Sequence, residues 1–220
     1  KIDQWNIIGK IGPVLFEKNS YELRLESYVS NAEILCLKLK HNTKLLVKNT
    51  DNPYRAELEF LMESTFRNST IAKIVSKADN NALIMVDYIK HGENLFETCK
   101  LLCPDKQVFF IRGEVEVAER EEVRKLVEKS TNVVIIAISK IFSTGINIKN
   151  LHYIIFAGGG KAKVKIVQSI GRGLRLHKDK KKLIIVDISD NFKYSLRHAE
   201  KRISLYESER IKRTTKEISE

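Results

Sequence analysis

The sequence has no apolar run near the roughly 18 residues that a membrane-spanning helix needs. Its first twelve residues, KIDQWNIIGKIG, also lack the apolar core of a secretory signal. We therefore expect a protein that works in the cytoplasm, without a membrane partner. The sequence does not begin with methionine, so we also expect it to be a piece of a longer protein.

Cysteine is scarce, and the three cysteines, Cys36, Cys99 and Cys103, cannot all be paired in disulfides. Cys99 and Cys103 are four residues apart, but no histidine or second cysteine pair accompanies them as metal ligands usually would. The expectation is reduced thiols and no metal site in this chain.

A complete phosphate-binding loop is also missing. The run Gly158-Gly159-Gly160-Lys161 resembles one, but the pattern G-x-x-x-x-G-K-[ST] would need glycine at Ile155 and a hydroxyl at Ala162. No Asp-Glu pair at a strand end supplies a magnesium site. We interpret the glycines as a turn, whose lysines Lys161 and Lys163 are available to a nucleic-acid backbone.

Basic residues, in contrast, are abundant. Lysine and arginine number 39 against 28 acidic residues, which gives a formal net charge of +11 and a pI near 9.5. Such a balance favours a polyanionic partner, with nucleic acid ahead of a membrane surface.

The middle of the chain alternates short apolar segments with amphipathic ones. The expected strands are residues 82–88, 107–111, 133–139, 152–157 and 182–189, and the expected helices are residues 92–102, 115–129 and 164–177. Strands that are apolar on both faces and separated by helices predict an α/β fold with a doubly wound, mainly parallel sheet. Ligands of such sheets gather at the carboxyl ends of strands, here after Tyr88, Ile111, Ser139 and Ala157.

The ends of the chain differ from this alternation. Residues 32–41 alternate like an exposed or edge strand, and residues 52–77 predict one helix, or two broken near Asn68-Ser69. Residues after Asn191 predict a charged C-terminal helix. We accordingly divide the chain into a leading connection and strand (1–45), an α/β domain (46–190) and a helical extension (191–220).

One predicted helix carries arginines without an obvious acidic partner. Gln168, Arg172 and Arg175 fall on one face over two turns, which suits a phosphate or a solvated basic surface. Gly171 and Gly173 each cost about 1 kcal/mol relative to alanine inside a helix. Their presence predicts a close backbone approach, either to a neighbouring element or to a ligand.

Longer segments resolve this ambiguity by resemblance. QSIGRGLR (168–175) resembles motif VI of superfamily 2 helicases, AISKIFSTGINIKNLHYIIFA (137–157) resembles motif V, and ALIMVDYIKHGENL (82–95) resembles motif IV. Their order and spacing are similar to those of the second, C-terminal RecA-like domain, and STGINIKNLHYIIFAGG looks most like phage recombination helicases of the UvsW type. The resemblance implies a RecA-like fold.

In that family, ATP and Mg²⁺ lie between two RecA-like domains, and the first domain holds most of the nucleotide. The resemblance implies that Arg172 and Arg175 are arginine fingers and that Gln168, Gly145 and Asn147 contact the nucleotide. A chain without the first domain is therefore expected to hydrolyse no ATP alone and to partner the N-terminal RecA-like domain of the same protein.

The resemblance also implies contacts with a nucleic-acid strand, DNA more than RNA. Ser139 and Thr144 match hydroxyl positions that bind phosphates. The cationic and backbone positions that we place along the strand are Lys90, Arg112, Gly113, Lys140, Lys161 and Lys163.

Three alternatives stay open at this point. The chain could be a non-catalytic nucleic-acid-binding module, an RNA helicase domain, or an α/β enzyme acting on a sugar phosphate or nucleotide. The last would need acids such as Asp187 and Asp190, which we instead expect to cap or pair with the basic C-terminal helix.

Overall fold

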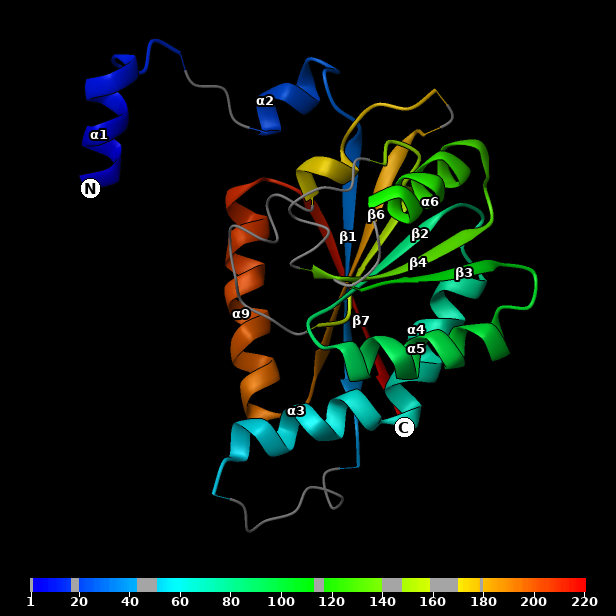
Figure 1. The fold of residues 1–220 in the computed structure, drawn as a ribbon. Helices are drawn as coiled ribbons and strands as arrows, with labels where there is room; N and C mark the ends of the chain where they lie inside the picture. Colours follow the sequence, from blue (N-terminus) through cyan, green and yellow to red (C-terminus); the bar gives the residue numbers. More distant parts are fainter. Residues whose placement is uncertain are drawn as a thin grey trace.

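The chain forms a parallel sheet with helices on both faces, seen in a computed structural model that describes residues 2–16, 20–42, 51–112, 117–139, 148–158, 170–178 and 180–220 (Figure 1). Within these residues the sheet has seven strands in the order β3-β4-β2-β5-β6-β1-β7, and every neighbouring pair is parallel. The predicted doubly wound α/β fold is confirmed. The strands are β1 (Asn31–Lys40), β2 (Ala82–Val86), β3 (Gln107–Ile111), β4 (Val133–Ile138), β5 (Tyr153–Phe156), β6 (Lys182–Asp190) and β7 (Lys212–Ser219).

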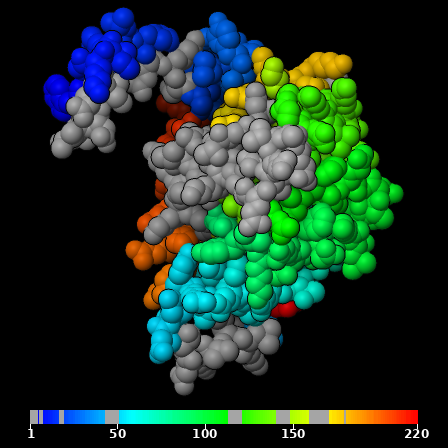
Figure 2. All heavy atoms as spheres, in the orientation of Figure 1, coloured from blue at the N-terminus to red at the C-terminus, as the bar shows by residue number. Residues whose placement is uncertain are grey.

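Two hydrophobic clusters cover the two faces of the sheet, because its central strands are apolar on both sides. One face packs against α4 and α5, and the other against α6, residues 170–174 and α9. α1 lies apart from the sheet in Figure 1, and its atoms project at the upper left of Figure 2, with Trp5 73% exposed. The helices are α1 (Ile2–Ile11), α2 (Ser20–Leu25), α3 (Pro53–Glu63), α4 (Thr65–Ser76), α5 (Ile89–Leu102), α6 (Val117–Lys129) and α9 (Lys193–Ser208).

β1 is an interior strand, so the expectation of an exposed or edge strand was wrong. It pairs with β6 on one side and β7 on the other, with Ile34 opposite Ile185 and Arg213. Its alternating sequence reflects partial exposure of one face near its start, where Glu33 and Leu35 are half-buried. β7 occupies the edge position instead.

The end of the chain gives the second correction. The predicted C-terminal helix exists as α9, but it ends at Ser208, and Arg210 turns the chain with a φ of 50°. β7 then follows with every residue exposed. This strand is held by main-chain pairing with β1 and not by burial, so its sequence carries no apolar pattern that could have identified it.

Residues 52–77 form two helices, and the break lies at Ser64, not at Asn68-Ser69. The Ser64 hydroxyl accepts a hydrogen bond from the backbone N–H of Arg67 (3.2 Å) and so caps α4. Asn68 lies buried inside α4, where its side chain donates to the Met62 carbonyl (3.0 Å).

α9 is fixed to the sheet by a buried ion pair. Arg202 donates to both oxygens of Asp187, at 2.8 Å from Nε and 2.6 Å from Nη2, and the Tyr206 hydroxyl also donates to this carboxylate. Asp187 therefore pairs with the basic helix, as expected, and lies inside β6.

Gly173 gives a direct test of close packing. A Cβ there would lie 2.6 Å from Ile154 Cδ1 and 2.8 Å from Leu183 Cδ2, whereas a Cβ at Gly171 would have nothing described within 4 Å. The predicted close approach to a neighbouring element is thus found at Gly173 and not at Gly171. We expect Gly173→Ala to lower the free energy of unfolding by about 1–3 kcal/mol, because the added methyl group overpacks this contact.

Chemical denaturation of the two alanine variants measures this difference. Gly171→Ala is the matched control, and we expect it to leave stability unchanged or to raise it by up to about 1 kcal/mol. Equal effects of the two substitutions would contradict the packing argument.

Candidate functional site

The predicted site residues that the structure describes fall into two groups at opposite edges of the sheet. Arg172 and Arg175 lie at the amino edge, the side of the sheet where the parallel strands begin. Ser30, just before β1, donates there from its backbone N–H to the Leu174 carbonyl (2.7 Å) and from its hydroxyl to the Arg175 carbonyl (3.4 Å). Ser139, Lys90 and Arg112 instead follow the carboxyl ends of β4, β2 and β3. The two groups therefore do not converge on one cleft.

Arg172 and Arg175 are both half-buried. In the part of the chain that the structure describes, Arg175 Nη1 is the one buried side-chain nitrogen or oxygen without a hydrogen-bond partner. A buried guanidinium nitrogen that lacks an acceptor suits an anion arriving from outside the chain. Their expected neighbours Gln168, Gly145 and Asn147 lie outside the described residues.

At the carboxyl edge, the two described cations already have acidic neighbours. Lys90 pairs with Glu63, and Arg112 Nη1 lies 3.5 Å from Glu93 Oε1. All four side chains are about half exposed. Such exposed pairs are weak and exchange readily for another anion. The positions Gly113, Lys140, Thr144, Lys161 and Lys163 lie outside the described residues.

Ser139 is more enclosed than a phosphate-binding hydroxyl would suggest. It is 4% exposed, and its hydroxyl donates to the Val86 carbonyl at the end of β2 (2.9 Å). Its oxygen therefore ties the ends of two neighbouring strands together. A contact with a nucleic-acid phosphate at this position stays a prediction.

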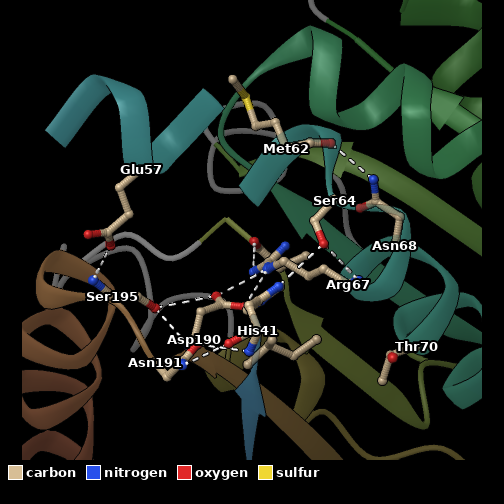
Figure 3. A network of polar contacts seen from close by, with 12 residues as sticks. His41, Glu57, Met62, Ser64, Arg67, Asn68, Thr70, Asp190, Asn191 and Ser195 are labelled. Atoms are coloured by element: carbon tan, nitrogen blue, oxygen red, sulfur yellow. Dashed lines mark hydrogen bonds and ion pairs between the residues drawn. The ribbon is translucent and has the colours of Figure 1, made fainter. Parts of the chain in front are cut away.

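A buried polar network underlies the same edge and was not anticipated from the sequence (Figure 3). Arg67 of α4 donates from Nε to both oxygens of Asp190 at the end of β6 (3.1 Å each) and from Nη2 to the Ala157 carbonyl after β5 (2.8 Å). His41, after β1, contacts Asp190 Oδ1 through Nε2 (2.8 Å). The network thus joins the ends of β1, β5 and β6 to α4.

The electrostatics of this network favour one ionised pair. Burial raises the pKa of Asp190, but the Arg67 charge and the His41 bond outweigh it and hold that pKa below its usual range. Burial, helped by the Arg67 charge, lowers the pKa of His91 to about 3. His91 is therefore neutral at neutral pH, and its Nε2 can accept from Arg67 Nη1 (3.3 Å).

Glu57 of α3 joins α3 to the start of α9. Its carboxylate accepts hydrogen bonds from the backbone N–H groups of Tyr194 (3.0 Å) and Ser195 (2.7 Å). These bonds cap the N-terminus of α9, because the N-cap residue Phe192 has no side-chain acceptor for them. Burial raises the pKa of Glu57, and the two backbone bonds oppose that rise. A cavity between α3, the start of α5 and the start of α9 lies beside this contact.

The described residues contain no group of three histidine, cysteine or acidic side chains arranged to hold a metal ion. Among them there is also no helix with the length and apolar character needed to cross a membrane.

The model of the protein family described as helicase conserved C-terminal domain matches residues 67–177. The chain belongs to this family. The matched residues run from Arg67 through the Arg172–Arg175 turn, so the described predicted site residues of both edges lie inside the family's domain.

Similar proteins place this helicase domain within superfamily 2 as the C-terminal RecA-like domain of a UvsW-like helicase. The chain is 27% identical over 231 aligned positions to the ATP-dependent DNA helicase UvsW of Enterobacteria phage T4, an alignment that covers 96% of this chain and 46% of that protein. It is 24% identical over 218 positions to putative helicase 22 of Sulfolobus islandicus filamentous virus, covering 92% and 38%. The helicase domain thus spans less than half the length of these relatives.

Solved structures agree on the fold. The crystal structure of T4 UvsW superimposes with a TM-score of 0.70 and 28% identity over 87% of this chain and 42% of that one. A fragment of a putative HsdR subunit of a type I restriction enzyme from Vibrio vulnificus gives a TM-score of 0.72 over 100% of this chain and 42% of that one, and its 13% identity supports the fold alone.

Proposed function

We propose that this helicase domain is the second motor half of an ATP-dependent DNA helicase or translocase that unwinds or branch-migrates DNA in recombination and repair. The similarity to the phage T4 DNA helicase over 96% of the chain carries this proposal. A phage relative also favours the host cytoplasm as the place of action.

In this proposal Arg172 and Arg175 reach the γ-phosphate of an ATP that another RecA-like domain of the same protein holds. The buried Arg175 Nη1 without a partner supports this role, because a guanidinium fork there has an unused donor for a phosphate oxygen. Gln168, Gly145 and Asn147 would contact the rest of the nucleotide. Mg²⁺ would be held mainly by the other domain, since the described residues offer it no cluster of acids.

At the carboxyl edge, the domain would hold one DNA strand through its phosphates. Lys90 and Arg112 are exposed there, and their weak ion pairs would exchange for phosphate oxygens. Ser139, Thr144, Gly113, Lys140, Lys161 and Lys163 complete this proposed path. The net charge of +11 supports a polyanionic partner.

ATP turnover of the isolated chain, compared with that of the full-length protein, tests the division of labour. We expect DNA-stimulated, Mg²⁺-dependent hydrolysis from the full-length protein and none above background from residues 1–220, because the phosphate loop is absent here. Malachite-green phosphate release measures both. Substantial Mg²⁺-dependent hydrolysis by the isolated chain would overturn the proposal.

A further inference from the structure

We propose that the aromatic rings at the mouth of the cavity between α3, the turn after β2 and α9 stack against an unpaired base of single-stranded DNA. The inference rests on the proposed function and adds a base-binding surface to a domain whose expected DNA contacts are to phosphates. We call this surface the aromatic cavity, defined by Tyr54, Tyr88, Tyr194 and His198.

Four aromatic rings from three separate elements meet at this cavity. Tyr54 comes from α3, Tyr88 precedes α5, and Tyr194 and His198 lie one turn apart on α9. The Tyr54 ring lies edge-on to Tyr194 at 5.2 Å between centroids and to His198 at 6.1 Å. Tyr54 and Tyr88 remain 41% and 43% exposed, so ring surface is available at the mouth of the cavity.

The floor of the aromatic cavity is polar, but its groups are already engaged. Both Glu57 oxygens accept backbone N–H groups at the start of α9, as Figure 3 shows for Ser195. Arg67 donates to Asp190 and to the Ala157 carbonyl. The floor groups are thus held by the fold and not directed at a base. Stacking on the rings, without readout of sequence by the floor, is therefore the binding mode that we propose.

Cationic residues neighbour the ring-bearing residues in the sequence, as a ligand made of bases and phosphates requires. Lys193 Nζ lies 5.7 Å from the centroid of the Tyr194 ring, and Arg197 is exposed on the same helix. Lys90 follows Tyr88 by two residues and is exposed, in an ion pair with Glu63. Ala157 and Gly158, which end β5, also line the cavity, so it lies at the edge of the sheet where the strand contacts are proposed.

A comparison of two oligonucleotides in the full-length protein isolates the stacking contribution. One is a short thymidine oligonucleotide, and the other has the same phosphates with abasic sites in place of its bases. We expect the unmodified protein to prefer the thymidine strand in fluorescence anisotropy titrations. Tyr54→Leu/Tyr88→Leu should weaken thymidine binding about 10-fold and leave abasic binding unchanged, because a stacked base contributes a factor of this order.

Two further variants control for folding and for the hydroxyl groups. Tyr54→Phe/Tyr88→Phe keeps both rings and should keep the preference for bases. Tyr28→Leu removes an exposed tyrosine that precedes β1, away from the aromatic cavity, and should change neither affinity. Equal thermal midpoints for all variants would confirm that the fold is intact.

The outcomes separate this inference from the proposed function. The base-stacking inference is overturned if the double leucine variant still prefers the thymidine strand. If that protein also shows DNA-stimulated ATPase, the helicase proposal still holds. Loss of the preference in the phenylalanine variant overturns stacking, because the rings are retained there. An unmodified protein that binds neither oligonucleotide and shows no DNA-stimulated ATPase refutes both.

Discussion

Replacing either Arg172 or Arg175 with alanine in the full-length protein should lower ATP turnover at saturating DNA by about 10³-fold or more, the loss typical of an arginine finger. The physical reason is that charge accumulates on the γ-phosphate oxygens as the phosphoryl group is transferred. A guanidinium therefore stabilises the transition state more than it stabilises the ground state. Steady-state phosphate release at saturating ATP measures it.

The same variants separate the motor from a non-catalytic DNA-binding module. If the two arginines are fingers, DNA affinity should fall little, since they lie at the amino edge, away from the proposed strand path. Lys178→Ala removes an exposed cation three residues beyond Arg175 and should change turnover less than about twofold. Reduced DNA affinity with unchanged turnover per bound complex would favour the module instead.

Arg67→Met should destabilise the domain by about 3–5 kcal/mol, because it leaves the Asp190 carboxylate buried without its main counter-charge and the Ala157 carbonyl without its donor. Urea denaturation followed by circular dichroism measures the change. Arg55→Met removes an exposed arginine of α3 that pairs with Glu59, and the free energy of unfolding should stay within about 0.5 kcal/mol of that of the unmodified protein.

The pH dependence of this loss identifies its cause. The pKa of Asp190 is held low in the folded protein, so its ionised form contributes stability above its unfolded pKa of about 3.9 and that stability is lost as pH falls through the folded pKa. In Arg67→Met the buried acid can instead take up a proton, which removes the unpaired charge. The loss of unfolding free energy in Arg67→Met, relative to the unmodified protein, should therefore be largest near neutral pH and shrink toward pH 4. A deficit independent of pH would indicate lost packing and not an orphaned charge.

The sheet could be predicted where burial shapes the sequence. β2 and β4 are buried on both faces and read as continuous apolar runs, and the order of βα units then defines the fold class. β7 could not be predicted, because its side chains are all exposed and its main-chain pairing with β1 leaves no apolar pattern in the sequence. The sequence prediction misplaced the break between α3 and α4, because a single capping hydroxyl, that of Ser64, determines where α4 begins.

The motif VI arginines were predicted from spacing and resemblance, but the edge of the sheet that they occupy depends on tertiary contacts such as that of Ser30 with Leu174. The Arg67–Asp190 pair was missed because its members are 123 residues apart. From the sequence alone, an arginine in a helix that contains both polar and apolar residues is expected to face the solvent. Only the fold reveals that it is 1% exposed.

The position of β1 determines the order in which the sheet can assemble. β1 leaves the ribosome before the other six described strands of its sheet, yet its partners are the last two of them: Asn31 lies opposite Lys182 and Glu33 opposite Lys212. β2, β3, β4 and β5 pair among themselves and can form a partial sheet earlier. During synthesis β1 therefore has neither of its partner strands until β6 and β7 have been made. Its pairing is a late, long-range step, and the entropy cost of closing the long loop slows folding.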